Sequence, residues 1–395
     1  MQKDGRLVQR VCIIRQRAYY ELPVRREAET LRDAGFEVDV ICLGETGHSR
    51  VEVDNGVRLH RLPLQRRKGG VLGYLADYLS FFVLAAVKVT RLHLTHPYRV
   101  IQVNTMPDSL VFATLIPRLL GARVVLFMKE PTPELGASLY RSPLAPFLLR
   151  IVERLALRYA HLVFTVTKQL KDTYVARGAR SGKIHVVLNG PDPRHLLGQH
   201  DAVPSDASRY TVICHGSVEE RYGHDTIVKA AKLVKDEIPG IRVRITGDGS
   251  YVGEMLELID RLGVGEYVDY LGWVDMPTLV EELRQADVGV VAQKSSPYSN
   301  LVHTNKMYEY IVMGIPVVLT RLASVQEYFG DDAVRYFEPD DPSSLAEAIL
   351  DLHRSPEKGR ALLENARKMY EAYSWEAQSQ VFLDGYRRVL DRGAG

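Results

Sequence analysis

Apolar and polar residues alternate along the first 190 positions in two different rhythms. Short runs rich in β-branched residues, such as 37–43 and 123–128, have the length of buried strands. Between them lie longer stretches, such as 24–34 and 145–159, whose apolar residues recur every three or four positions, as on one face of a helix. Strands that alternate with helices predict a parallel sheet covered on both faces. Further strands are expected at 8–14, 99–103, 162–166 and 183–188, and a further helix at 108–120.

The same alternation starts again after a polar segment, from Asn189 to Ser208, that is dense in turn-forming residues. Asp341 and Pro342 are typical cap and first-turn residues of a helix, and helical periodicity continues from there almost to the end. With 395 residues the chain has room for two domains, which we expect to face each other across a cleft. Strands are expected at 210–214, 241–246, 267–271, 288–292 and 316–319, and helices at 225–235, 252–262, 277–285 and 303–312.

Composition and cysteine use are those of a soluble protein in a reducing compartment. Apolar residues make up 46% and charged residues 25% of the chain, which excludes disordered and fibrous classes. Cys12, Cys42 and Cys214 each lie inside an apolar run, without the spacing of a disulfide framework or a zinc site. The first residues are polar and lack the apolar core of a signal peptide, so we expect a cytoplasmic protein.

Charge is distributed unevenly between the two halves. Residues 1–200 hold 30 Lys and Arg against 17 Asp and Glu, a difference of +13, and residues 201–395 hold 21 against 32, a difference of −11. A basic half favours anionic partners such as phospholipid headgroups, a pyrophosphate-linked lipid or nucleic acid. The alternative is a diffuse, solvated surface charge without a partner.

An apolar stretch from Val71 to Leu94 bears on the same question. Between Asp77 and Lys88 only ten residues are uncharged, whereas a membrane span needs about 20, so this segment is not expected to cross a bilayer. Its helical spacing fits either a helix packed on the core or one that lies on a membrane surface.

Two glycine-rich segments follow consecutive strands of the second half, at 216–223 and 247–249. Ligands of parallel sheets bind beyond the carboxyl ends of strands, where glycine lets the backbone approach a phosphate. Arg221 would supply the planar cation that stabilises a pyrophosphate as its charge grows. Either segment alone is also compatible with an ordinary turn.

Lys306 and Glu309 are three residues apart, so they share one face of a helix near its start. Gly314 ends that helix and Pro316 begins a strand. A lysine and a carboxylate so placed suit a diphosphate and a pair of ribose hydroxyls. The alternative is a surface ion pair of little energetic value.

Taken in order, these segments resemble the retaining glycosyltransferase family 4, whose members have the GT-B fold of two facing Rossmann-like domains. One such segment alone is common, but the ordered set at these spacings is hard to obtain by chance. The resemblance covers most of the chain and runs through residues 23–41, 106–108, 133–135, 187–192, 216–223, 247–249, 271–274, 286–289, 305–310 and 314–318.

The resemblance implies roles for individual residues. Glu309 matches the second glutamate of the family's paired-glutamate motif and would bind the ribose. Arg221 and Lys306 would bind the diphosphate, and the backbone around Val274 would hold the base. Cations and helix ends would do the work of a metal, so neither a metal nor a cofactor is expected. Other donor contacts are expected from Gly216, Ser217, Gly247, Asp248, Gly249 and Asn305, and acceptor contacts from Arg25, Arg26, Glu130 and Glu134.

Some positions depart from the family pattern. The first glutamate of the pair falls at Leu301, and Tyr222 stands where many members have a second phosphate-binding lysine. Lys129 and Glu130 replace a His-Asp pair, and the segment 16–22 contains no glycine-rich loop. These changes suggest an unusual donor sugar, a divergent acceptor or a loss of activity.

The sequence therefore predicts an α/β protein of GT-B fold, with an acceptor domain at 1–190, a donor domain at 210–372 and a last helix, 373–395, that returns to the first domain. We expect it to transfer a hexosyl or N-acetylhexosaminyl group from a nucleotide-diphosphate sugar to a lipid-linked or cell-envelope saccharide, with retention. It would act on the inner face of an anionic membrane and bind no nucleic acid. A nucleotide-sugar epimerase, a sugar phosphorylase and an inactive partner subunit are the alternatives. An oxidoreductase is disfavoured because no Gly-x-Gly-x-x-Gly opens the first helix of either half.

Overall fold

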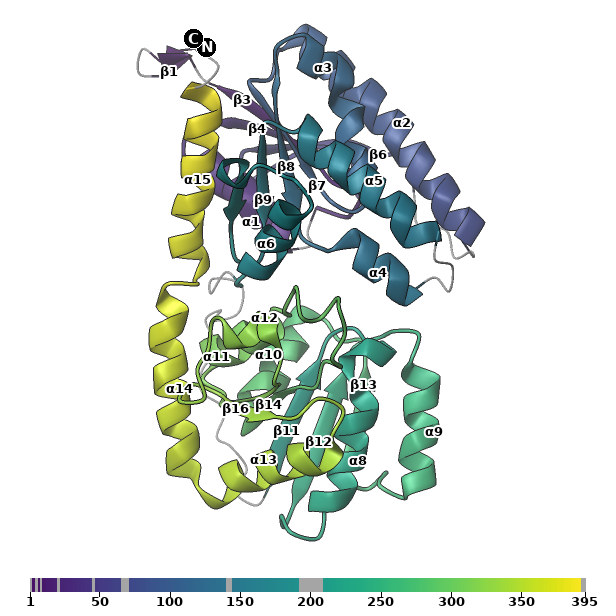
Figure 1. Cartoon of the computed structure of the whole chain (residues 1–395), viewed down its shortest axis with the longest axis vertical. Helices are drawn as coiled ribbons and strands as arrows, with labels where there is room; N and C mark the ends of the chain where they lie inside the picture. Colours follow the sequence, from purple (N-terminus) through teal and green to yellow (C-terminus); the bar gives the residue numbers. More distant parts are fainter. Residues whose placement is uncertain are drawn as a thin grey trace. The chain divides into compact units, whose positions relative to one another are not determined.

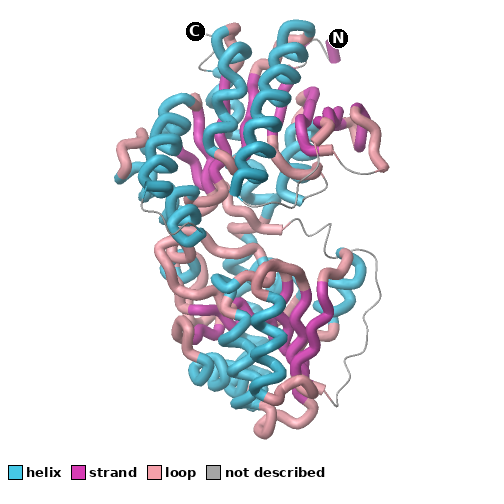
Figure 2. Tube along the Cα trace, turned by 90° about the vertical axis from the view of Figure 1, so that its right-hand side faces the viewer, coloured by secondary structure: helices cyan, strands magenta, loops and turns pink. Residues whose placement is uncertain are grey.

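A computed structural model describes residues 2–3, 6–7, 9–19, 22–44, 47–64, 71–139, 144–191 and 209–391. The chain divides into two compact units (Figure 1). Unit 1 comprises Met1–Asn189 together with Glu376–Gly395, and unit 2 comprises Gly190–Trp375. Helices cover the strands in each unit (Figure 2). The expected linker lies, from residue 192 to 208, outside the described residues.

Unit 1 is built on a sheet whose described strands follow the order β10-β9-β8-β7-β3-β4-β6-β5, and among these only the edge strand β5 runs antiparallel. The central strands β7 and β8 are almost wholly buried, which explains their continuous apolar sequences. A separate antiparallel pair is formed by β1 (Gln2–Lys3) and β2 (Arg6–Leu7). The sheet strands are β3 (Arg10–Ile14), β4 (Glu37–Leu43), β5 (Val51–Asp54), β6 (Val57–Leu62), β7 (Val100–Asn104), β8 (Arg123–Met128), β9 (Leu162–Thr165) and β10 (Ile184–Val186).

The last helix of the chain completes the core of unit 1, as the sequence predicts. The ring of Phe382 lies 5.2 Å from that of Phe164, and the Tyr386 hydroxyl donates to Gln102 Oε1 at 2.6 Å. The helices of this unit are α1 (Leu22–Asp33), α2 (Val71–Thr95), α3 (Leu115–Leu119), α4 (Thr132–Leu139), α5 (Leu144–Tyr159), α6 (Lys168–Ala176) and α15 (Trp375–Asp391), with 3₁₀ turns η1 (Asp108–Thr114) and η2 (Ser181–Lys183).

Unit 2 contains a sheet whose described strands are all parallel, in the order β13-β12-β11-β14-β15-β16. They are β11 (Tyr210–His215), β12 (Ile241–Thr246), β13 (Val268–Gly272), β14 (Val288–Val291), β15 (Val317–Thr320) and β16 (Arg335–Phe337). The helices are α8 (His224–Val234), α9 (Val252–Leu262), α10 (Met276–Arg284), α11 (Lys306–Met313), α12 (Ala323–Gln326), α13 (Pro342–Arg354) and α14 (Pro356–Glu371), with a 3₁₀ turn η3 (Glu220–Tyr222).

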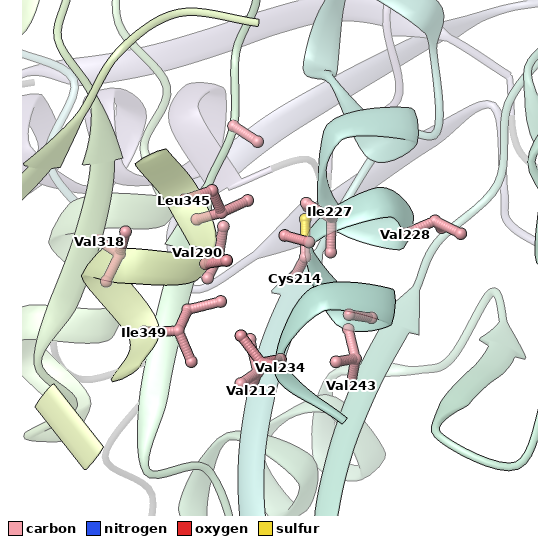
Figure 3. Close-up of a cluster of buried hydrophobic side chains, with 14 of the residues drawn as sticks. Val212, Cys214, Ile227, Val228, Val234, Val243, Val290, Val318, Leu345 and Ile349 are labelled. Atoms are coloured by element: carbon pink, nitrogen blue, oxygen red, sulfur yellow. The ribbon is translucent and has the colours of Figure 1, made fainter. Parts of the chain in front are cut away.

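Apolar side chains from strands and helices interlock in the core of unit 2 (Figure 3). Val212 and Cys214 of β11 meet Ile227 and Val234 of α8, and Leu345 of α13 belongs to the same cluster. Fully burying each side chain of this size contributes about 1.5–3 kcal/mol. Asp341 caps α13 by accepting from two backbone amides, as its sequence predicts.

A hairpin and a 3₁₀ turn differ from the expected elements. The strands β5 and β6 form a hairpin that the periodicity did not reveal, closed by Asn55 and Gly56, both with positive φ. The helix expected at 108–120 is instead the 3₁₀ turn η1 followed by one turn of α-helix, α3.

The apolar stretch in unit 1 folds as the long helix α2. By length and composition, residues 76–95 pass as a membrane span, but one such helix is weak evidence. Phe81, Ala85 and Val89 lie fully buried on one face of the helix, so core packing, one of the two expected roles, accounts for that face.

Candidate donor-binding site

The strand order of unit 2 places a candidate site at the carboxyl end of β11. β12 and β13 continue from β11 in one direction and β14, β15 and β16 in the other, so the chain changes direction between β11 and β14. Ligands of open parallel sheets bind at such a switch point. The loop after β11 is tied to the loop after β14, because the Lys294 amide donates to the Arg221 carbonyl at 2.9 Å.

Glycines line this edge because no side chain fits there. A Cβ on Gly247 would lie 1.8 Å from the carbonyl oxygen of Gly216, and one on Gly223 would lie 1.9 Å from that of Ala292. Gly216 has φ +98°, and its Cβ position is 2.7 Å from Cε of Lys306. The lysine side chain therefore lies directly against the glycine backbone.

Two cations converge on the ring of Tyr222. Nζ of Lys306 is 4.6 Å and Cζ of Arg221 is 4.9 Å from the ring centroid. Within the described residues, neither has a carboxylate within ion-pair distance, and the buried Nε of Arg221 lacks a hydrogen-bond partner. Burial lowers the pKa of Lys306, and nearby Arg221 lowers it further. Two cations without a neighbouring carboxylate in the described chain make this a favourable position for an anion.

Glu309 lies beside a histidine in the same site. Its Oε2 lies 3.0 Å from Nε2 of His215, the last residue of β11. The Tyr310 hydroxyl accepts from the His215 amide at 3.3 Å. Lys306 and Glu309 belong to the first turn of α11, which accounts for their common position as the sequence predicts.

The other residues expected to bind the donor lie along the same edge of the sheet. Ser217 is exposed beside Gly216, and the Asp248 side chain accepts from the Gly249 amide at 2.8 Å. Val274 comes two residues after Gly272, whose carbonyl accepts from the Gly247 amide at 2.7 Å. Asn305 precedes α11 and its carbonyl accepts from the Glu309 amide at 3.1 Å.

A separate buried network occupies the carboxyl ends of β7 and β8 in unit 1. Lys129 Nζ donates to Glu27 Oε1 at 2.6 Å, and Gln102 and Asn104 donate to Glu27 Oε2 at 2.8 and 2.7 Å. Burial lowers the pKa of Lys129 to about 7, although Glu27 opposes this shift. Lys129 therefore ties α1 to the sheet where the family pattern has a histidine.

The four residues expected on the acceptor side are dispersed among internal contacts. Arg25 forms an ion pair with Glu29 at 2.9 Å, and buried Arg26 donates to Asn189. Glu134, in the first turn of α4, accepts from Arg177, whereas Glu130 is half-buried just after β8. Acceptor contacts by these residues stay a prediction.

Sequence reasoning missed three contributors. His215 directly precedes the glycine segment 216–223 and matches no motif, and the sequence indicates for Tyr222 only that it replaces a lysine. Glu27 looked like any helix residue, since its place under Lys129 depends on long-range packing.

In the part of the chain that the structure describes, no three His, Cys, Asp or Glu side chains are grouped to hold a metal ion.

Two family models match the chain, one to each unit. The glycosyl transferase 4-like domain matches residues 22–190, and glycosyl transferases group 1 matches residues 209–355. The chain therefore belongs to the family 4 type of glycosyltransferases, which confirms the predicted family.

Curated relatives are distant. The chain spans about half the length of the relatives that it matches, such as 44% of the D-inositol 3-phosphate glycosyltransferase of Paenarthrobacter aurescens, 23% identical over 46% of this chain. One match is longer: the 2-deoxystreptamine N-acetyl-D-glucosaminyltransferase of Streptomyces fradiae is 24% identical over 95% of this chain and 92% of its own length.

Solved structures establish the fold. The HepE protein of Anabaena in complex with UDP-glucose is similar with a TM-score of 0.72 and 16% identity, covering 96% of this chain and 99% of that chain. The predicted GT-B fold is thereby confirmed.

Proposed function

We propose that the chain is a glycosyltransferase that takes a sugar from a nucleotide-diphosphate donor bound in unit 2. The observation that carries the proposal is the pair of cations, Arg221 and Lys306, that lie over Tyr222 without a carboxylate within ion-pair distance in the described chain. The family supports it, and the similar Anabaena protein has been solved with UDP-glucose, so a uridine donor is the first candidate.

The proposed chemistry is stabilisation of a leaving group. As the bond between the anomeric carbon and the β-phosphate oxygen breaks, negative charge grows on the diphosphate. Lys306 and Arg221 meet that charge from fixed positions, and Gly216 and Gly247 let backbone come close. Glu309, beside His215, accepts hydrogen bonds from the ribose hydroxyls. With these cations in place, the site would need no metal ion.

The acceptor is proposed to be a lipid-linked or cell-envelope saccharide that binds unit 1, with a hexosyl or N-acetylhexosaminyl group transferred under retention. The basic first half supports an anionic acceptor or membrane surface. The protein would then work in the cytoplasm, peripherally on the inner face of the membrane. Two relatives are named for cyclitol acceptors, inositol phosphate and 2-deoxystreptamine. Soluble cyclitols are therefore the second candidate acceptor.

Incubation with UDP-, GDP-, ADP- and TDP-sugars, with and without saccharide acceptors, tests the proposal. Release of nucleoside diphosphate together with a glycosylated product is expected, and Lys306→Ala should lower its rate at least tenfold. The matched control is Lys232→Ala, an exposed lysine on α8. Conversion of the sugar without release of diphosphate would indicate an epimerase. Binding of nucleotide without turnover of any donor would indicate an inactive partner subunit.

A further inference from the structure

The outer face of α2 in unit 1 is apolar and uncovered. Opposite its buried stripe, Leu79, Val83 and Val87 follow one another at intervals of four residues and remain exposed, Leu79 by 65%. A helix that is apolar on both faces gains from a second apolar environment. Within unit 1, no described residue covers these three side chains.

Two neighbouring segments also expose apolar side chains. The turn η1 contacts α2, α3 and α5, so these helices are neighbours on one side of the unit (Figure 1). On α3 the side chain of Leu119 is 74% exposed. Large exposed apolar patches mark interaction sites. The other exposed apolar residues are Leu115, Ile116 and Leu120 around α3, and Leu144, Phe147, Leu148, Ile151 and Leu155 on α5.

A strongly basic cavity of about 870 Å³ opens at the end of α5. Arg177 is neutralised by Glu134 and Glu153. For the other five cations, no carboxylate of the described chain comes within ion-pair distance. Burial, together with Arg118 and Arg180, lowers the pKa of Lys183 to about 8. The cationic residues that line it are Arg118, Arg154, Arg158, Arg177, Arg180 and Lys183.

The same two helices carry the cavity and the apolar face. On α3, Arg118 of the cavity precedes exposed Leu119, and on α5 exposed Leu155 stands between Arg154 and Arg158. An anion in the cavity therefore lies beside apolar side chains. A free phosphate needs only the cations, whereas a phospholipid surface offers anionic headgroups above apolar chains.

We propose that α2, α3 and α5 dock unit 1 onto an anionic phospholipid surface, with a lipid phosphate in the basic cavity and the exposed leucines at the acyl boundary. The inference deepens the proposed function, because it names the surface that would bring the protein to a membrane-held acceptor. It does not need the donor site, which belongs to unit 2, so nucleotide binding and lipid binding can be measured separately.

Flotation of the full chain with vesicles tests the docking. Binding to phosphatidylcholine vesicles that contain phosphatidylglycerol is expected to exceed binding to phosphatidylcholine alone, and to weaken as salt is raised. Arg154→Glu with Arg158→Glu should weaken it about tenfold or more, since two surface cations are reversed. Leu148→Ser with Leu155→Ser should weaken it as well.

The matched controls are Lys232→Glu and Leu233→Ser, an exposed lysine and an exposed leucine on α8 of unit 2, which should bind vesicles as the wild type does. An unchanged thermal unfolding transition of unit 1 shows that each variant in that unit is folded, because nucleotide binding reports only on unit 2. Equal binding to neutral and anionic vesicles, or no vesicle binding by the wild type, would overturn the proposal. So would Arg158-dependent binding of inorganic pyrophosphate without vesicle binding, which would make the cavity a site for soluble anions.

Discussion

Lys306 and Arg221 show how a binding site can be recognised at the scale of single residues. Both cations lie over the ring of Tyr222, where the π-face offers weak compensation for their charge. Burial, and to a smaller extent the nearby Arg221, lowers the pKa of Lys306, which indicates that holding a charged lysine here lowers folding stability. A bound dianion would compensate both positive charges.

Glu309 and Lys306 should have separable effects on binding. Lys306→Ala removes a charge-assisted bond to phosphate, so the affinities for UDP and for inorganic pyrophosphate should both fall about 10 to 100-fold. Glu309→Ala should lower the affinity for UDP but leave the affinity for pyrophosphate unchanged, because the carboxylate binds the ribose. Calorimetric titration measures both ligands, and equal losses for both ligands in Glu309→Ala would refute the ribose role.

Asp108 of η1 should make the stability of unit 1 depend on pH. Burial raises the pKa of its carboxyl to about 7, and Thr132 donates to Oδ1 at 3.0 Å. Between pH 4 and 7 the folded chain keeps a proton that the unfolded chain releases, so this residue lowers stability as the pH rises through that window.

Asp108→Asn keeps the acceptor for Thr132 and removes the titration. Relative to the wild type, its free energy of unfolding at pH 7 should be higher by a few kcal/mol, with the difference disappearing near pH 4. Urea unfolding across this range is the measurement. A difference that does not change with pH would contradict the assignment.

At the scale of elements, the loops after β11 and β12 interlock through glycine. Gly247→Ala would bring Cβ within 1.8 Å of the Gly216 carbonyl at φ +136°, so it should destabilise unit 2 by roughly 3 kcal/mol or more and abolish UDP binding. Gly253→Ala, in α9 with open space around it, should instead stabilise by about 0.5–1 kcal/mol. Thermal unfolding compares them, and equal melting temperatures would show that the loop is not so constrained.

Elements with regular apolar periodicity were predictable from the sequence. Elements and contacts that depend on a local turn or on packing between distant segments were not. β4, β8, β12 and α9 have the bounds that their apolar runs predict. The hairpin β5–β6 is an edge whose exposed residues obscure alternation, although Asn55–Gly56 carried the turn signal. The site followed from motifs as far as its cations and Glu309. The proximity of His215 to Glu309 could not be predicted, because it depends on the strand register that brings the end of β11 beside α11.

At the scale of the whole molecule, the chain leaves unit 1, forms unit 2 and returns to complete the first core with α15. Phe382 lies fully buried between the rings of Phe127, Phe164 and Tyr386. Unit 1 therefore depends on a segment that follows unit 2 in the chain.

Phe382→Ala should cost unit 1 about 3–5 kcal/mol, because it leaves a cavity among aromatic rings. UDP binding by unit 2 should persist, since the substituted side chain belongs to the other core. Leu271→Ala, at an exposed leucine of β13, is a control for stability. Differential scanning calorimetry with and without UDP separates the two units, and an unchanged transition for unit 1 would contradict the role of α15.

Unit 2 is proposed to bind the diphosphate of a nucleotide sugar. A crystal structure of the protein soaked with UDP-glucose tests this binding most directly. The account predicts phosphate oxygens within hydrogen-bond distance of Lys306 Nζ and the Arg221 guanidinium, with the ribose hydroxyls on Glu309. A nucleotide bound elsewhere, or an edge of β11 and β12 that stays empty at saturating ligand, would contradict it.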